Sequence, residues 1–169
     1  YSCMPSMSSV IHKHNKSILN ATKEPESRKC NCPRNSTCPL DGNCLQRNLI
    51  YKAAMSSGDD TKFYYGLCEP EFKSRLANHK KAFKNKVYIK DTELSKYVWD
   101  LKDHKKEFSI KWTLESTAAP CQSGSSRCDL CLTEKLKIAQ ADPRTLINKR
   151  SEIISKCRHR NKFTLKCLK

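Results

Sequence analysis

The sequence predicts a small α/β (α+β) fold in which helices flank a three-stranded, mostly antiparallel sheet. Two short segments rich in β-forming residues, 48–54 and 62–68, are separated by a turn-forming run at 56–60, as in a hairpin. Apolar and polar residues alternate strictly over 108–114, which is typical of a strand with one buried face. Helical periodicity between and after these segments predicts the flanking helices.

The chain divides by composition into four parts. Residues 1–29 are expected to form a short amphipathic helix and a polar linker, and residues 30–46 form a cysteine-rich segment. The core is expected at 47–150, with a Cys-x-x-Cys pair inserted in it, and 151–169 form a basic C-terminal segment. The core length suits one domain of about 100 residues.

The helix predicted over 72–83 turns a cationic side chain toward the core. His79 lies in the apolar stripe of this helix, and Arg75 lies just beside the stripe. A buried arginine requires an anion or hydrogen-bonding partners, and a structural salt bridge would meet that need. The preceding hairpin offers another explanation, because Tyr51 and Tyr64 can hold phenol groups near the guanidinium.

Another amphipathic helix is predicted over 92–101, with Glu93 in its first turn. A glutamate there interacts favourably with the helix dipole, which is one explanation for its position. It would also supply the hard oxygen ligand that Mg²⁺ or Mn²⁺ prefers, so Glu93 is a candidate metal ligand.

Four cysteines lie within 15 residues, at Cys30, Cys32, Cys38 and Cys44. This stretch is polar and too short to form its own core, so it requires a metal or covalent crosslinks. Two disulfides would serve, but the Cys-x-Cys spacing opposes an internal disulfide and suits a metal. The spacing therefore favours a structural Zn²⁺ site.

A second half-site is the pair Cys128 and Cys131, which Cys157 and His159 could complete as a Cys₃His zinc site. Cys121 is an alternative third ligand. The pair opens a helix predicted over 130–140 by an apolar stripe of Leu132, Leu136 and Ala139. With four protein ligands, zinc at either site would be structural.

The chain carries 33 Lys and Arg against 17 Asp and Glu, a formal net charge of +16 at pH 7. A polyanion is the expected partner, and no segment is apolar enough to suggest a membrane span. The candidates for DNA-phosphate contacts are Lys80, Lys81, Lys84, Lys86, Lys149, Arg150 and Arg158. Such contacts predict salt-sensitive binding without base readout.

Eleven cysteines and three glycosylation sequons, at Asn15, Asn20 and Asn35, would also suit a secreted protein built on disulfides. The odd number of cysteines, their metal-like spacing and the high positive charge favour a reducing intracellular compartment instead.

From residue 48 to residue 150 the chain resembles a GIY-YIG endonuclease, a family built on a small three-stranded sheet. Leu49-Ile50-Tyr51 stands at the first family motif, with leucine in place of glycine. Tyr64-Tyr65-Gly66 stands at the second motif, with tyrosine in place of isoleucine. The remaining family positions are matched by Arg75, His79, Glu93 and Asn148.

With its cysteine segments included, the chain is similar to the endonuclease region of a Penelope-like retroelement. That resemblance implies a nuclear, metal-dependent DNA endonuclease that follows the reverse transcriptase in one polyprotein. Its cut would leave a 3′-hydroxyl that primes reverse transcription of the template RNA, and it would take no small-molecule substrate.

The resemblance also implies roles for the site residues. Tyr51 would orient or deprotonate the attacking water, and Tyr64 or His79 would relay the proton. Arg75 would stabilise charge on the phosphorane, Glu93 would bind Mg²⁺ or Mn²⁺, and Asn148 would hold Glu93 or a phosphate oxygen. The alternative of another class is a zinc-stabilised nucleic-acid-binding module that performs no catalysis.

Overall fold

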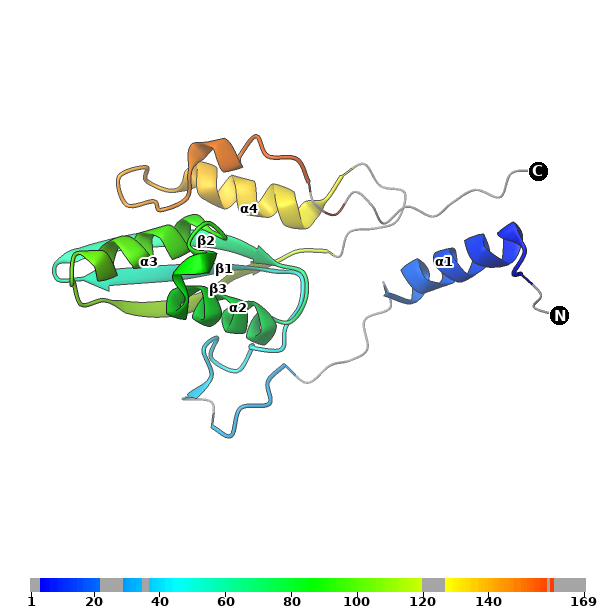
Figure 1. Cartoon of the computed structure of the whole chain (residues 1–169), viewed down its shortest axis with the longest axis horizontal. Helices are drawn as coiled ribbons and strands as arrows, with labels where there is room; N and C mark the ends of the chain where they lie inside the picture. The colour runs from blue at the N-terminus through cyan, green and yellow to red at the C-terminus, as the bar shows by residue number, and fades with distance from the viewer. Residues whose placement is uncertain (1–3, 22–28, 35–36, 120–126, 158, 160–169) are drawn as a thin grey trace.

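Three strands form one antiparallel sheet in the order β2-β1-β3. The central strand β1 (Leu49–Ser57) pairs with β2 (Asp60–Cys68) on one side and with β3 (Ser109–Thr117) on the other (Figure 1). The computed structural model describes residues 4–21, 29–34, 37–119, 127–157 and 159. The expected α+β class and its small antiparallel sheet are confirmed, with four α-helices in the described part of the chain.

The β1–β2 hairpin is tighter than the sequence pattern suggested. Ser57 pairs with Asp60, so only Gly58 and Asp59 form the turn. Gly58 has a positive φ of +59°, which glycine adopts without steric cost and which two-residue hairpin turns require. The predicted hairpin is confirmed, but its turn is shorter than the run 56–60, because Ser56, Ser57 and Asp60 belong to the strands.

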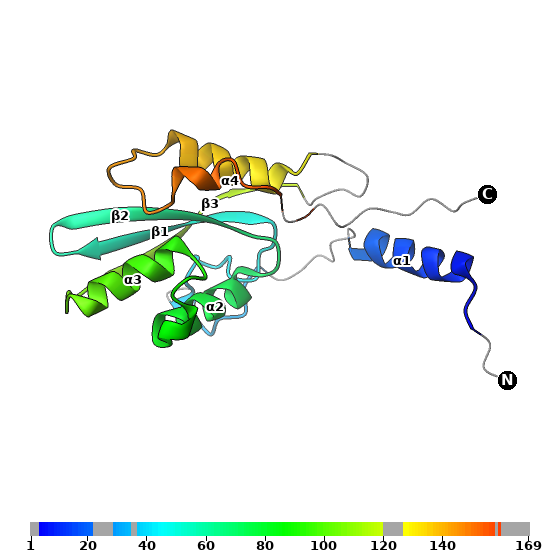
Figure 2. The same cartoon turned by 45° about the horizontal axis from the view of Figure 1, so that its top comes forward.

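Helices cover both faces of the sheet (Figure 2). α2 (Phe72–Lys84) and α3 (Glu93–Asp103) cover one face, and α4 (Asp129–Gln140) covers the other. The alternation of side chains in β1 follows this division: Tyr51 belongs to the main core, and its neighbour Ile50 packs in the cluster beneath α4.

The main core lies between the sheet and the helices α2 and α3. It is formed by buried residues from the strands and from both helices, together with Leu40 of the cysteine-rich segment. Its largest fully buried side chains include those of Tyr51 and Phe72, whose rings lie 5.2 Å apart between centroids. Trp112 of β3 packs against both rings, so side chains of β1, β3 and α2 meet in this part of the core.

α4 forms where it was predicted, but its apolar stripe faces outward. Leu132 is 47% exposed and Leu136 is 54% exposed, and Ala139 is exposed as well. The buried residues of α4 are instead Leu130, Cys131 and Ile138. The orientation of this helix is decided by the contacts of Cys128 and Cys131 and by packing on the sheet. Hydrophobic periodicity does not report either of them.

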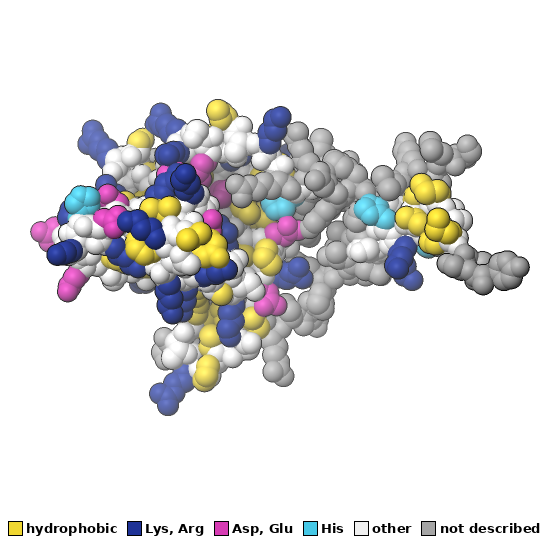
Figure 3. Space-filling view, viewed as in Figure 1, with side chains coloured by type: hydrophobic (Ala, Val, Ile, Leu, Met, Phe, Trp, Pro, Cys, Tyr) yellow, Lys and Arg dark blue, Asp and Glu magenta, His cyan; other side chains and the backbone are white. Residues whose placement is uncertain are grey.

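α1 (Met7–Ala21) lies apart from the sheet in both views (Figures 1 and 2). Its apolar side chains gather on the surface, where Met7 is 74% exposed and Val10 is 47% exposed (Figure 3). Two short 3₁₀ turns complete the described elements, η2 (Lys86–Tyr88) and η3 (Arg150–Glu152). The predicted features that lie outside the described residues are Asn35, Cys121 and Arg158.

Candidate active site

A buried hydrogen-bonded chain joins Tyr51 of β1 to α2. Nε of Arg75 donates to the hydroxyl of Tyr51 at 3.2 Å, and the same hydroxyl lies 2.7 Å from Nε2 of His79. Because arginine can only donate, the phenol can give its own proton to the neutral imidazole. The predicted proximity of the phenol, guanidinium and imidazole is thus present. Among the described residues no carboxylate forms a salt bridge with Arg75, and the phenol of Tyr51 is its hydrogen-bond acceptor.

Burial keeps Tyr51 and His79 of this hydrogen-bonded group neutral, whereas Arg75 stays charged. Burial raises the pKa of Tyr51 to about 12, although the neighbouring Arg75 opposes the shift. Burial lowers the pKa of His79 to about 3, with Arg75 adding to the effect. At neutral pH the imidazole is therefore uncharged, and Tyr51 retains its proton.

The lowered pKa of His79 predicts a specific pH dependence of stability. An unfolded histidine takes up a proton near pH 6.5, whereas folded His79 resists protonation down to about pH 3. The unfolded state binds more protons in this window, so the stability is complete above the unfolded pKa and falls as the pH decreases. We expect this residue to contribute a slope of roughly 1.4 kcal/mol per pH unit between pH 6 and 5.

Urea unfolding of the parent and of His79→Gln over this range measures that slope. Any contribution from the cysteine clusters is shared by both proteins, so the difference between the two curves isolates His79. Parallel curves would show that the imidazole titrates normally in the folded protein.

Gly66 of β2 makes room for the phenol of Tyr51, its pairing partner in β1. A Cβ added at Gly66 would lie 2.4 Å from Oη and 2.5 Å from Cζ of Tyr51. A well-packed core cannot absorb contacts this short without moving the ring or the strand. The glycine therefore allows Tyr51 to lie across β2 and reach His79.

We expect Gly66→Ala to lower the free energy of unfolding by about 3 kcal/mol, because it overpacks the core against Tyr51. Gly58→Ala is the matched control, since a Cβ there meets nothing within 4 Å and only the positive φ is strained. That strain costs about 1 kcal/mol. Chemical denaturation measures both values, and equal losses would contradict the packing role of Gly66.

A cavity of about 450 Å³ opens beside the hydrogen-bonded group of Tyr51, Arg75 and His79. Its wall includes Tyr64 from β2, Arg75 from α2 and Glu134 from α4. Tyr51 is 0% exposed, so it lies behind the wall and supports Arg75 from the protein side. The predicted contact of Tyr51 with water is not available in this arrangement, and Tyr64 is the motif tyrosine that faces the cavity.

Tyr64 is a neutral hydrogen-bond donor at this wall. Burial raises its pKa well above the usual value, and the negative charges of Glu152 and Glu134 contribute to the rise, whereas Arg75 opposes it. The phenol keeps its proton at neutral pH, so it is suited to donating to an oxygen in the cavity rather than to removing a proton.

Glu93 also lines the cavity, but two lysines hold its carboxylate. Oε1 lies 2.6 Å from Nζ of Lys96 and 3.3 Å from Nζ of Lys149. Partial burial would raise the pKa of Glu93, but Lys96 and Lys149 together lower it below its usual value. A cation at Glu93 would have to displace these ammonium groups, which weakens the predicted role of this residue as metal ligand.

Asn148 is used entirely in bonds to the protein. Its Oδ1 accepts from the backbone N–H of Tyr65 at 2.7 Å, and its Nδ2 donates to the carbonyl of Tyr65 at 2.8 Å. Nδ2 also donates to Oε2 of Glu152 at 3.1 Å. Instead of holding Glu93 or a phosphate oxygen, the amide continues the edge of β2 and fixes Glu152 beside the cavity.

Glu134 is the acidic residue that sequence analysis missed. It lies one turn after Cys131 on α4, and its Oε1 accepts from the backbone N–H of Leu67 at 3.0 Å. Its charge contributes to the raised pKa of both Tyr51 and Tyr64, so the carboxylate lies within electrostatic reach of both phenols. The spacing from Cys131, on the face of α4 that is buried, is the signal that could have revealed it.

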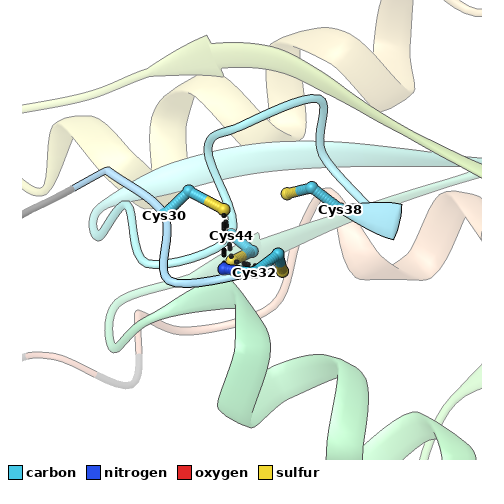
Figure 4. A group of neighbouring side chains, drawn as sticks. All are labelled: Cys30, Cys32, Cys38 and Cys44. Carbon is cyan, nitrogen blue, oxygen red and sulfur yellow. Dashed lines mark hydrogen bonds between the residues drawn. The ribbon is translucent and has the colours of Figure 1, made fainter. Parts of the chain in front are cut away.

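The first cysteine cluster brings all four predicted ligands together (Figure 4). The sulfur atoms of Cys30, Cys32, Cys38 and Cys44 lie within 4.8 Å of one another, and that of Cys44 lies 3.5 Å from that of Cys30. Thiolates around one Zn²⁺ are about 3.8 Å apart, whereas disulfide sulfurs are about 2.05 Å apart. None of these four thiols is in a disulfide, so the cluster could hold zinc.

The second cluster has the predicted Cys₃His composition, and its four ligand atoms also lie within 4.8 Å of one another. Nδ1 of His159 lies 3.5 Å from Sγ of Cys128, 3.2 Å from Cys131 and 3.6 Å from Cys157. The other ring nitrogen, Nε2, lies 3.3 Å from the carboxylate of Glu69. A carboxylate behind a histidine ligand is a common arrangement at zinc sites, so this cluster could hold zinc as well.

The predicted phosphate-binding cations are all exposed where the structure describes them, and Figure 3 shows Lys and Arg side chains spread over the visible face. Two of them are in ion pairs, Lys86 with Asp103 at 2.9 Å and Lys149 with Glu93. Two lysines that were not predicted, Lys90 and Lys135, line the cavity itself, together with Lys156 of the basic C-terminal segment. They come from distant parts of the chain, so only the fold brings them together.

These features define a cavity whose wall carries phenol and guanidinium groups, lysines and carboxylates together, flanked by a thiol-rich cluster. No protein-family model, curated protein or solved structure matches the chain. Within the described part of the chain, no helix is long and apolar enough to cross a membrane.

Proposed function

We propose that the chain is a metal-dependent DNA endonuclease of the GIY-YIG type that hydrolyses phosphodiesters at this cavity. The observation that carries the proposal is the convergence of Tyr64, Arg75 and Glu134 on one cavity from three different elements. The net charge of +16 supports a polyanionic substrate, and the cavity wall carries both cations for a phosphate and carboxylates for a metal.

Arg75 is the group that would bind the scissile phosphate. One edge of its guanidinium is held by Tyr51, which fixes the side chain while it lines the cavity. A fixed guanidinium offers paired donors to phosphate oxygens and stabilises the additional charge of the transition state. Tyr64 would donate to another oxygen of the same phosphate or to the attacking water.

Glu134 is the best candidate to hold Mg²⁺ or Mn²⁺, in place of Glu93. The donor set fits, because Mg²⁺ uses one or two carboxylates and completes its shell with water and substrate phosphate. Glu152 lines the same cavity and supplies further carboxylate oxygen. When bound, such a metal lowers the pKa of water and offsets charge on the phosphate.

In the proposed reaction, water attacks phosphorus and the bond to the 3′ oxygen breaks. The leaving oxygen takes a proton and becomes a 3′-hydroxyl, while the phosphate remains on the 5′ side of the neighbouring nucleotide. Arg75 would stabilise the phosphorane, and the neutral pair Tyr51 and His79 would hold Arg75 in place.

The resemblance to Penelope-like retroelements supports a wider proposal. The cut would expose the hydroxyl that primes reverse transcription, with the polymerase part of the same polyprotein and its template RNA as partners. Zinc at the two cysteine clusters would be structural, since each cluster offers four ligands.

Nicking of supercoiled plasmid in Mg²⁺ or Mn²⁺ tests the proposed activity. The parent should convert supercoiled to open-circular DNA, and EDTA should stop cleavage. Under the same conditions, gel shift at moderate salt should still show binding while zinc is retained. If the full-length protein binds DNA and never cuts it, the zinc-stabilised binding module is the correct interpretation.

A further inference from the structure

The first turn of α2 is capped by the cysteine-rich segment rather than by its own side chains. Glu71 at the N-cap makes no side-chain hydrogen bond to the helix. The backbone N–H of Phe72 donates to the carbonyl of Gln46 at 3.2 Å, and that of Lys73 donates to the carbonyl of Cys44 at 2.8 Å. The N–H groups that a helix start normally leaves unpaired thus find acceptors outside the helix.

Cys44 is both a member of the first cluster and an acceptor for α2. Its sulfur lies among the other thiols, its carbonyl accepts from Lys73, and the residue is 0% exposed. Nζ of Lys73 adds a link from α2 by donating to Oδ1 of Asn31 at 2.8 Å, between two cysteines of the cluster. Arg75 follows within the same turn of α2.

The second cluster is joined to α4 in a different way, because two of its four ligands, Cys128 and Cys131, belong to the start of the helix itself. Cys128 is the N-cap residue, it makes no side-chain cap to the helix, and its carbonyl accepts from the N–H of Leu132 at 3.0 Å. Cys131 supplies a second sulfur from the first turn of the helix. Glu134 lies one turn further on the same face and lines the cavity beside Cys131 and His159.

We infer that each cysteine cluster, when it holds zinc, anchors the N-terminal turn of one of the two helices that bear site residues. The first cluster positions α2 and Arg75, and the second positions α4 and Glu134. The inference concerns the nuclease site and so rests on the proposed function, but the anchoring itself can be measured without any cleavage.

Loss of zinc from one cluster should therefore loosen one helix start and leave the other unchanged. The sheet packs against α3 as well as α2 in the main core and should retain its protection. The thiols are then positioning residues whose metal state controls the geometry of the cavity from both sides.

Hydrogen exchange on paired variants tests this inference. Cys30→Ser removes a ligand of the first cluster that takes no part in the contacts with α2, and Cys30→His keeps four ligands. Cys157→Ser and Cys157→His are the matching pair for the second cluster. Zinc content is measured for each variant, and the histidine variants should retain zinc.

In Cys30→Ser we expect amides 72–75 to exchange about tenfold faster, as for a helix that loses its cap, with amides 129–134 and those of β1 unchanged. Cys157→Ser should give the reverse pattern, and both histidine variants should restore the parent rates. Unchanged helix amides after zinc loss would overturn the inference. So would uniform loss of protection across the sheet, because the cluster would then support the whole fold.

Nicking separates this inference from the proposed function. If the parent cuts DNA, each serine variant should lose about a hundredfold in rate while its DNA affinity is retained, and the histidine variants should recover. If the parent does not cut but the exchange pattern appears, the anchoring stands and only the proposed function fails. If serine variants without zinc cut as fast as the parent, the positioning role is wrong.

Discussion

Glu134→Gln is expected to reduce plasmid nicking by about a thousandfold, because it removes the charged oxygen proposed to hold the catalytic metal. Glu93→Gln is the comparison, and it should retain at least about a tenth of the parent rate, since Lys96 and Lys149 already neutralise that carboxylate. The measurement is the initial rate of nicking in Mg²⁺ at saturating enzyme.

The amide of Glu134→Gln can still accept from the N–H of Leu67, so the contact that Glu134 makes with β2 can be kept. Unchanged zinc content and unchanged DNA affinity would show that the fold and the cationic surface are intact. The reverse ranking, with Glu93→Gln inactive and Glu134→Gln active, would indicate that Glu93, at the N-terminus of α3, is the metal ligand.

The fold and the thiol clusters could be predicted because their signals are local. Alternation identified β3, the hairpin pattern identified β1 and β2, and cysteine spacing identified both clusters. Each of these patterns depends on neighbours within a few residues of one another. The predicted Cys₃His set is the exception, since Cys157 and His159 were joined to it across the sequence.

Local sequence patterns could not show whether Glu93 or Glu134 is the better candidate for the metal ligand. Glu93 opens α3 and Glu134 lies midway along α4, and only the packing of α4 on the sheet brings Glu134 to the N–H of Leu67 and to the cavity wall. The same packing exposes Leu132 and Leu136, whose spacing had indicated the buried face. Leu130, Cys131 and Ile138 are buried in their place, so the predicted stripe gave the wrong side of this helix.

The burial of Tyr51 was also beyond the sequence pattern. Alternation puts Tyr51 on one face of β1, but it does not show that Gly66 leaves space for the ring to reach His79. As a result, the first motif tyrosine supports the arginine from behind, and Tyr64 is left to face the cavity.

Arg75→Ala should reduce the nicking rate by about a thousandfold, because it removes the cation proposed to bind the phosphate and the donor that holds Tyr51. Arg75→Lys should recover only part of this rate. A lysine keeps the charge but offers a single ammonium group, which cannot bond Tyr51 and present paired donors to a phosphate together. Single-turnover nicking measures both variants.

Tyr51→Phe is the control that separates the two functions of Arg75. It removes the bond that orients the guanidinium but leaves the charge, so its loss should be smaller than that of Arg75→Ala, about tenfold to a hundredfold. If Tyr51→Phe were as inactive as Arg75→Ala, the phenol itself would take part in the reaction. That result would require the cavity to open as far as Tyr51 when DNA binds, because in this structure the side chain is completely buried.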